Sequence, residues 1–303
     1  MSERTDMGEP GLSAIMSERR QLINLAYRLL GSLADAEDVV QETYARWYAM
    51  TGPEREAIDN PPAWLTKVAS RICLDLLRSA RARRERYVGE WIPEPLPESS
   101  EWHTGQTGPD PADRVTLDES VNMAFLVVLD SMTPAERVAF ILHDVFRYPF
   151  PEVAEIVGRT PAACRQLASS ARRRIQDAEL PSAPSARRAQ LIQQFKQAWE
   201  ATDIAALVSL LDPDVTAVAD GGGVVTAALE PVRGGAEVAR YFAELPVFRL
   251  GRTLLERTVN GQPGLVIQFE GVTETVIAFD VDGDHIRNIW AIRNPEKLQP
   301  WTR

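Results

Sequence analysis

The sequence predicts a multidomain protein that is all-α up to about residue 180 and α+β beyond it. Three observations predict this fold class: a helix-turn-helix pattern at residues 149–175, a proline-rich acidic stretch at residues 87–116, and apolar segments separated by Asn-Gly and Asp-Gly pairs after residue 252. At 303 residues, the chain is long enough for two or three domains with separate cores.

Three helices are expected in the N-terminal part. Residues 1 to about 16 are polar, and we expect them to be disordered. Apolar side chains at helical spacing predict an amphipathic helix over residues 19–30, which Gly31 ends. A second helix begins after Ser32 and carries an acidic face opposite its apolar stripe. A third helix over residues 60–86 carries lysine and arginine along one rim.

The stretch at residues 87–116 has the composition of an extended linker. It contains five prolines and three glycines, and six acids but one arginine lie between Trp91 and Asp118. Trp91, Ile92 and Pro93 form an apolar cluster within it, which a flexible spacer rarely contains.

The helix-turn-helix pattern is the stretch around which the helical part is organised. Gly158 suits the end of its first helix because glycine readily adopts the left-handed conformation, and Thr160-Pro161 suits the start of the second. Five arginines and no acids lie between Gly158 and Arg174. A basic second helix in this arrangement is typical of a helix that reads the major groove of DNA. The alternative is an ordinary helical hairpin with a solvated basic face.

After a second linker at residues 181–186, the pattern becomes that of an α+β domain. Asn260-Gly261 and Asp282-Gly283 are strong hairpin signals. Helices followed by an antiparallel meander predict a domain with a curved antiparallel sheet. The expected helices cover residues 188–201, 203–211 and 235–245, and the expected strands cover residues 215–219, 224–228, 252–259, 265–270, 273–279 and 285–292.

Composition restricts the function classes. The net charge of −10 argues against generic binding of polyanions, so DNA binding requires locally concentrated positive charge, as in the second helix of the helix-turn-helix. Cys73 and Cys164 fit neither a disulfide framework nor a metal-ligand spacing. The longest apolar run, over residues 123–129, is too short to span a bilayer, and the N-terminus has no signal-peptide core. We therefore expect a cytoplasmic protein with no membrane partner.

No catalytic motif is recognisable in the sequence. Three aspartates within residues 280–284 are spaced like calcium ligands, but His285 stands at the sixth position of that loop and Ala291 at the twelfth, where glycine and glutamate are needed. Asp220 precedes three glycines and is either a pocket acid or part of a turn. We therefore expect no enzyme activity, no cofactor and no metal.

Six stretches together carry a family resemblance. Residues 26–47 and 60–79 resemble sigma region 2, and residues 132–175 resemble sigma region 4. WIPEPL at residues 91–96, DGGG at 220–223 and NPEKL at 294–298 narrow the match. Together they resemble bacterial sigma factors of the extracytoplasmic-function (ECF) class, in the SigJ-like subgroup with a fused SnoaL-like C-terminal domain.

The resemblance implies the domain boundaries. They are a disordered N-terminus at 1–16, sigma region 2 at 17–86, the acidic linker at 87–116, sigma region 4 at 117–180, a short linker at 181–186, and a SnoaL-like regulatory domain of cone-shaped α+β fold at 187–303.

The resemblance also implies a sigma factor that directs RNA polymerase core to promoters and initiates transcription. In this class, the acidic helix docks on the β′ clamp coiled coil, region 4 contacts the β flap, and the two regions recognise the −10 and −35 promoter elements. The matching positions are Asp35, Glu37, Asp38, Gln41 and Glu42 for polymerase, Lys67 and Arg71 for the −10 element, and Thr160, Arg165, Gln166, Ser169, Arg172 and Arg173 for the −35 element. Arg71 departs from the asparagine often found there.

In the resembling subgroup, the C-terminal domain regulates the sigma core within the same chain. The implied contact set comprises Trp91, Pro93, Glu94, Pro95, Asp220, Gly221, Gly222, Gly223, Asn294, Pro295, Lys297 and Leu298. Val224 stands where a lysine is common and Glu296 where an aspartate is common, so any charge pairing at residue 224 is weakened.

Two other interpretations stay open. The cone-shaped fold is shared with polyketide cyclases and ketosteroid isomerases, so one interpretation is an active enzyme that uses Asp220, although fold alone confers no activity. The other is a DNA-binding regulator whose C-terminal domain senses a small ligand that shifts its contact with the linker.

Overall fold

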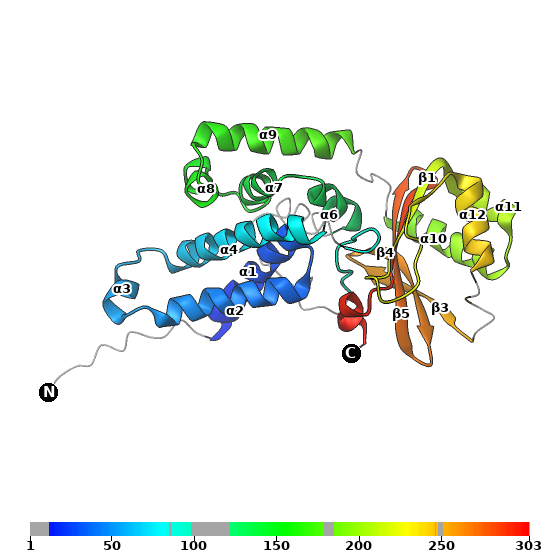
Figure 1. The fold of residues 1–303 in the computed structure, drawn as a ribbon, viewed down its shortest axis with the longest axis horizontal. Coiled ribbons are helices and arrows are strands. Elements are labelled where there is room, and N and C mark those ends of the chain that lie inside the picture. The colour runs from blue at the N-terminus through cyan, green and yellow to red at the C-terminus, as the bar shows by residue number, and fades with distance from the viewer. Residues whose placement is uncertain are drawn as a thin grey trace.

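The computed structural model describes residues 12–84, 87–97, 122–178, 185–245, 247 and 251–302. A helical part lies beside a sheet whose one face is covered by helices, and residues 87–97 pass between the two parts (Figure 1). The predicted order of helical units followed by an α+β unit is confirmed. None of the helices in the described ranges has the length and hydropathy needed to cross a membrane.

The first helical unit consists of α1 (Leu12–Leu30), α2 (Leu33–Ala49), α3 (Gly52–Glu56) and α4 (Pro61–Arg84). Gly31 ends α1 with a φ of 70°, and the Ser32 hydroxyl caps α2, as expected. The prediction of disorder was wrong for residues 12–16, because no glycine or proline interrupts the helical backbone there. Residues 1–11 lie outside the described residues.

The second helical unit consists of α6 (Met123–Asp130), α7 (Pro134–Phe140), the π-helical η1 (Ile141–Val145), α8 (Phe150–Val157) and α9 (Pro161–Asp177). Gly158, with a φ of 73°, ends α8 and Thr160 caps α9, so the helix-turn-helix is confirmed. The α-helix expected to run to Val145 becomes π-helical, because the Phe146 N–H bonds to the carbonyl five residues back. The start expected at about residue 115 lies outside the described residues.

The two helical units share one hydrophobic core, to which α1, α2, α4 and α6–α9 all contribute. Arg137 of α7 crosses between the units and is only 3% exposed. Its guanidinium donates to the carbonyl of Leu29 at the end of α1 (2.9 Å) and to the carboxylate of Asp130 (2.8 Å). Because an unpaired buried guanidinium would be costly, these bonds help to hold the units together.

The C-terminal unit is α+β. Its elements are α10 (Ser185–Glu200), α11 (Ile204–Leu210), β1 (Leu211–Asp220), β2 (Val232–Arg233), α12 (Gly235–Glu244), β3 (Thr253–Val259), β4 (Gln262–Phe269), β5 (Val272–Asp282), β6 (His285–Ile292) and the 3-10 helix η3 (Pro295–Trp301). The six strands are ordered β2-β1-β6-β5-β4-β3.

Two sequence predictions about this sheet were wrong in detail. The sheet is mixed, because β1 pairs with β6 in parallel while the other neighbours are antiparallel. The strand expected at residues 224–228 is a loop, because Gly222 and Gly223 take positive φ values of 65° and 71° and turn the chain away from the sheet.

Both faces of the sheet are buried, each by a different part of the chain. Alternate residues of β4 illustrate this: Leu265 packs under α10–α12, whereas Val266 packs on the opposite face. On that second face the sheet is covered by Ile92 of the linker, Met123 of α6 and Leu298 of η3. The C-terminal unit therefore buries apolar surface against the linker and α6.

Candidate functional site

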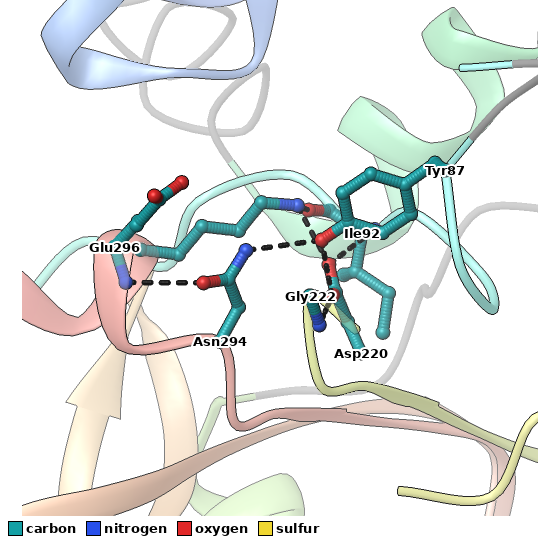
Figure 2. A network of polar contacts seen from close by, with 7 residues as sticks. Tyr87, Ile92, Asp220, Gly222, Asn294 and Glu296 are labelled. Atoms are coloured by element: carbon teal, nitrogen blue, oxygen red, sulfur yellow. Dashed lines mark hydrogen bonds and ion pairs between the residues drawn. The ribbon is translucent and has the colours of Figure 1, made fainter. Parts of the chain in front are cut away.

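Three stretches far apart in the sequence meet at Asp220, which ends β1 and is 1% exposed. The hydroxyl of Tyr87 donates to Oδ1 (2.6 Å), the N–H of Ile92 donates to Oδ2 (3.0 Å), and the ammonium of Lys297 lies 2.6 Å from Oδ2 (Figure 2). The side-chain amide of Asn294 donates to the Tyr87 hydroxyl (3.0 Å). We call these five residues the clasp.

The ion pair at the centre of the clasp is shielded from water. The side chain of Asp220 is fully buried and that of Lys297 is 11% exposed. The Lys297 ammonium also donates to the carbonyl of Ile92 and lies 4.2 Å from the ring centroid of Trp91. A buried ion pair is favourable only while its remaining donors and acceptors are satisfied. The linker supplies several of those partners, so the pair depends on the linker being in place.

The glycines after Asp220 allow the loop to approach its neighbours closely. A Cβ at Gly222 would lie 2.5 Å from Cγ of Asn294, and a Cβ at Gly223 would lie 3.1 Å from Cβ of Val88. The N–H of Gly222 donates to Oδ1 of Asp220 (3.0 Å). A larger side chain at either glycine would displace the clasp or the linker.

On its other side, the linker is bonded to the first helical unit through Glu94. Its carboxylate accepts from the N–H of Leu33 (2.8 Å), its own N–H donates to the carbonyl of Gly31 (2.8 Å), and its carbonyl accepts from the hydroxyl of Tyr27 (2.7 Å). A linker carboxylate therefore caps the N-terminus of α2. Burial raises the pKa of Glu94 to about 7, with the Leu33 N–H and the charge of Lys297 opposing the shift.

Two residues that sequence reasoning did not assign to the site complete this contact. Asn260 is fully buried, its amide donates to the Tyr27 hydroxyl (2.8 Å), and its side-chain oxygen accepts from the N–H of Leu96 (3.0 Å). The sequence identified Asn260 as part of a hairpin signal and placed position 27 in the amphipathic helix expected over residues 19–30. Their contact joins positions 233 residues apart, so no local signal could have found it.

The other members of the expected contact set lie around the clasp. Leu298 packs in the same core as Ile92, and the indole of Trp301 donates to the carbonyl of Pro95 (2.8 Å). Val224 is 75% exposed and takes no part. Pro93 lies next to Gly31, the carbonyl of Gly221 accepts from the N–H of Val225 in the loop, and Pro295 begins η3.

The acidic face of α2 is open to solvent. All five residues expected to bind polymerase are exposed: Asp35, Glu37, Asp38, Gln41 and Glu42. Among the described residues, the only ion pair that these five residues form is the one between Glu42 and Arg46 of the same helix (2.8 Å). The face is therefore available for a basic partner in this conformation.

The two residues expected at the −10 element are engaged within the protein. Both contact Glu155 of α8, in the first helix of the helix-turn-helix. The ammonium of Lys67 forms an ion pair with its carboxylate, and the guanidinium of Arg71 donates to its backbone carbonyl (3.0 Å). These contacts place α4 against the second helical unit.

The residues expected at the −35 element lie on or at the start of α9, and two are engaged within the protein. Arg172 forms an ion pair with Asp144 (2.6 Å), and Arg165 lies 5.5 Å from the ring centroid of Phe150. Thr160 is the helix cap. Gln166, Ser169 and Arg173 line a groove of about 840 Å³, to which Arg78 of α4 also contributes.

The aspartate and the cysteines that were considered as possible metal ligands or disulfide partners lie buried in the fold. Asp280 is 5% exposed and accepts from Asn288 in the sheet (2.9 Å). Cys73 and Cys164 are free and buried. In the part of the chain that the structure describes, no group of three or more His, Cys, Asp or Glu side chains could hold a metal ion.

Comparison with known proteins identifies the class. The Sigma-70 region 2 family model matches residues 14–83, and the Sigma-70 region 4 family model matches residues 122–175. These are the promoter-recognition modules of sigma factors. The two helical units therefore define a sigma factor, with α9 as the second helix of the region 4 helix-turn-helix.

The relatives narrow the class to one family. The ECF RNA polymerase sigma factor SigJ of Mycobacterium tuberculosis is 40% identical over 293 residues, which cover 92% of this chain and 90% of that protein. The probable ECF RNA polymerase sigma factor SigI of the same species is 33% identical over 297 residues, 96% of each chain. The crystal structure of M. tuberculosis SigJ matches with a TM-score of 0.73 and 36% identity, covering 95% of this chain and 98% of that chain.

The chain therefore belongs to the ECF RNA polymerase sigma factors, and the predicted resemblance is confirmed. It binds RNA polymerase core and promoter DNA and directs the polymerase to promoters. Its C-terminal unit is a SnoaL-like domain, as the sequence predicted.

The clasp predicts a large effect of one substitution. Lys297→Met should lower the free energy of unfolding by about 3–5 kcal/mol, because it leaves the Asp220 carboxylate buried without a counter-charge. Urea unfolding measures the loss, and hydrogen exchange at the Ile92 N–H should become faster. Lys196→Met is the matched control in the same domain. Its partners Glu200 and Glu256 are 40% and 49% exposed and stay hydrated without it, so the substitution should cost less than about 1 kcal/mol. Equal losses in the two variants would contradict the role of the clasp.

Glu94 predicts a pH dependence of stability. Its pKa is raised from 4.5 to about 7 in the folded protein, so the folded state binds the proton more tightly than the unfolded chain. Protonated Glu94 therefore stabilises the folded state fully below pH 4.5, and this stabilisation is lost as the pH rises to about 7. Between these values, wild type should lose about 3 kcal/mol more stability than Glu94→Gln.

The control for this comparison is Glu90→Gln, because Glu90 is an exposed acid of the same linker. Urea unfolding at several pH values measures all three proteins. The Glu90→Gln profile should follow wild type. If the Glu94→Gln profile also follows wild type, the burial of the Glu94 carboxylate does not control stability.

Proposed function

We propose that the SnoaL-like domain restrains this sigma factor in cis and that release of the clasp allows it to initiate transcription. The observation that carries the proposal is the position of the linker. Residues 87–97 are bonded to the C-terminal domain through Asp220 and to region 2 through Glu94. A linker held on both sides resists the separation of the sigma regions.

The spacing of promoter elements explains why separation is needed. The −10 and −35 elements lie about 25 base pairs apart, roughly 85 Å at about 3.4 Å per base pair. Region 2 and region 4 share one hydrophobic core here, with Lys67 and Arg71 of region 2 against Glu155 of region 4. Two units in contact cannot reach both elements, so promoter binding requires them to separate.

The proposed docking face fits a sequence of events in which polymerase binds first. Asp35, Asp38 and the other acidic residues of α2 are exposed while the proposed −10 residues are engaged within the protein. We assign this face to the β′ clamp coiled coil, region 4 to the β flap, and α9 to the −35 element. Polymerase can thus bind the closed protein before promoter DNA does.

The C-terminal domain acts as a regulator rather than an enzyme in this proposal, and the protein acts in the cytoplasm. The support is the hydrogen bonding of Asp220, the residue that would be the acid or base if the domain were an enzyme. Both of its oxygens accept hydrogen bonds, from Tyr87 and Gly222 at Oδ1 and from Ile92 and Lys297 at Oδ2. A carboxylate saturated with donors is a poor general base.

Run-off transcription with core polymerase on a cognate promoter tests the restraint. Lys297→Met and the milder Tyr87→Phe, which removes one donor to Asp220, should each raise transcript yield several-fold over wild type. Lys196→Met should leave it unchanged. Transcript yields at or below wild type for both clasp variants would refute restraint by the clasp, and Tyr87→Phe guards against simple misfolding.

Charge reversal tests the proposed docking face. Asp38→Arg should weaken binding to core polymerase about tenfold or more, because it places a positive charge opposite a basic partner, while leaving promoter preference unchanged. Glu244→Arg makes the same charge change at an exposed position of α12 and should bind like wild type. Equilibrium binding to fluorescently labelled core polymerase measures both. Unchanged binding by Asp38→Arg would show that the docking assignment is wrong.

A further inference from the structure

The SnoaL-like domain contains a cavity that the clasp does not use. It lies between the sheet and the helices that cover it, and its volume is about 350 Å³, within the range of roughly 300–1,000 Å³ for ligand pockets. Most of the wall is apolar. The apolar lining includes Trp199, Phe242, Leu245, Val247, Ile267 and Ile277. The indole N–H of Trp199 is already satisfied by the carbonyl of Phe242 (2.7 Å), so this wall offers mainly apolar contact.

The charged side chains that line the cavity do not balance. Arg252 and Glu274 form an ion pair with each other (2.5 Å). Arg293 donates to the backbone carbonyl of Thr226, and among the described residues no carboxylate pairs with it. Arg293 therefore has no carboxylate partner within the described part of the chain, and an apolar surface adjoins it. Such a combination favours an anionic ligand.

Tyr241 adds a second polar group at the same wall. It lines the cavity together with Arg293, and burial raises the pKa of its hydroxyl, with the Arg293 charge opposing the shift. The hydroxyl therefore stays protonated near neutral pH and is able to donate a hydrogen bond. A guanidinium and a phenol in one wall are two groups from which a carboxylate can accept hydrogen bonds.

We propose that this cavity binds a small, mainly apolar carboxylic acid, with Arg293 holding the carboxylate and the aromatic wall holding the apolar body. The proposal concerns ligand binding and requires no chemical step. It goes beyond cis regulation, because the site exists whether or not the clasp restrains transcription.

The position of Arg293 also connects the cavity to the clasp, and this part of the inference rests on the proposed function. The N–H groups of Arg293 and Asn294 both donate to the carbonyl of Asp220 (2.7 and 3.0 Å). The guanidinium of Arg293 holds Thr226 in the loop that follows the clasp glycines. A carboxylate that draws this guanidinium away from Thr226 would loosen the loop that carries Gly222. Ligand binding and clasp opening are then thermodynamically linked.

The first experiment uses the full chain and three acids with their neutral amides. The probes are benzoate, 2-naphthoate and octanoate against benzamide, 2-naphthamide and octanamide, measured by saturation-transfer NMR and calorimetry. At least one acid should bind with a dissociation constant below about 1 mM and at least tenfold more tightly than its amide. Equal binding of acid and amide, or binding by none of the acids, would overturn the proposal without need of any variant.

A substitution then locates the site. Arg293→Met should weaken binding of the acid roughly tenfold to a hundredfold and leave binding of the amide unchanged, because only the charged hydrogen bond is lost. Arg287→Met is the matched control, since Arg287 lies on β6, pairs with Asp282 and does not line the cavity. If Arg287→Met weakens binding of the acid as much as Arg293→Met does, the site is wrongly placed.

The link to the clasp has its own readout. If the acid favours an open clasp, linkage requires that the clasp substitution Tyr87→Phe strengthen binding of the acid. We expect its dissociation constant to fall several-fold. An unchanged dissociation constant would overturn the linkage and leave the binding site in place. Failure of the transcription test under the proposed function would leave this binding measurement unaffected, so the two results are distinguishable.

Discussion

A fully buried carboxylate needs a counter-charge and a complete set of donors, and Asp220 imposes that requirement on the whole molecule. Lys297 supplies the counter-charge, and Tyr87, Ile92 and Gly222 supply hydrogen-bond donors. These contacts fix the positions of η3, the linker and the glycine loop. Three separate stretches of the chain supply these groups: the linker with Tyr87 and Ile92, the loop with Asp220 and Gly222, and η3 with Lys297. The carboxylate therefore acts as the point at which the sigma part and the SnoaL-like part are joined.

The same arrangement explains why the C-terminal domain does not pack as a separate unit. The second face of its sheet is apolar, and Ile92, Met123 and Leu298 cover it. Opening the clasp fully would expose this face to water at a cost of about 25 cal/mol per Å². A partly opened state, in which the linker moves while α6 stays against the sheet, keeps the contact of Met123 and avoids that part of the cost. We therefore regard a change in the linker as more accessible than complete dissociation of the domain.

Local chemistry made much of the fold predictable. The caps at Ser32 and Thr160 and the left-handed Gly158 each depend on a few neighbouring residues, and each was expected from the sequence. The parallel pairing of β1 with β6 was not, because strand neighbours far apart in sequence leave no periodic signal. The apolar run at residues 224–228 suggested a strand, but the preceding positive-φ glycines determined the path of the chain.

The candidate site divides in the same way. The motifs that contain Trp91, Asp220 and Lys297 were found through a family resemblance, and the structure brings them together. The contact between Tyr27 and Asn260 was missed, because tyrosine in an apolar stripe and asparagine in a turn are each fully explained by local structure. The wall that carries Arg293 was missed for a related reason. A single arginine after a strand has no pattern until the cavity beside it is known.

The linker and the proposed polymerase-docking face meet at the start of α2, which constrains how opening can begin. Glu94 caps the N-terminus of that helix at Leu33, and the exposed acid Asp35 lies two residues further on. A partner that binds α2 changes the electrostatic environment of the cap, since the helix terminus and both carboxylates lie within one turn. By linkage, a partner that weakens the Glu94 cap favours release of the linker, and release of the linker favours that partner. Polymerase bound at α2 would therefore act on the linker directly, through the cap, without a signal passing through the SnoaL-like domain.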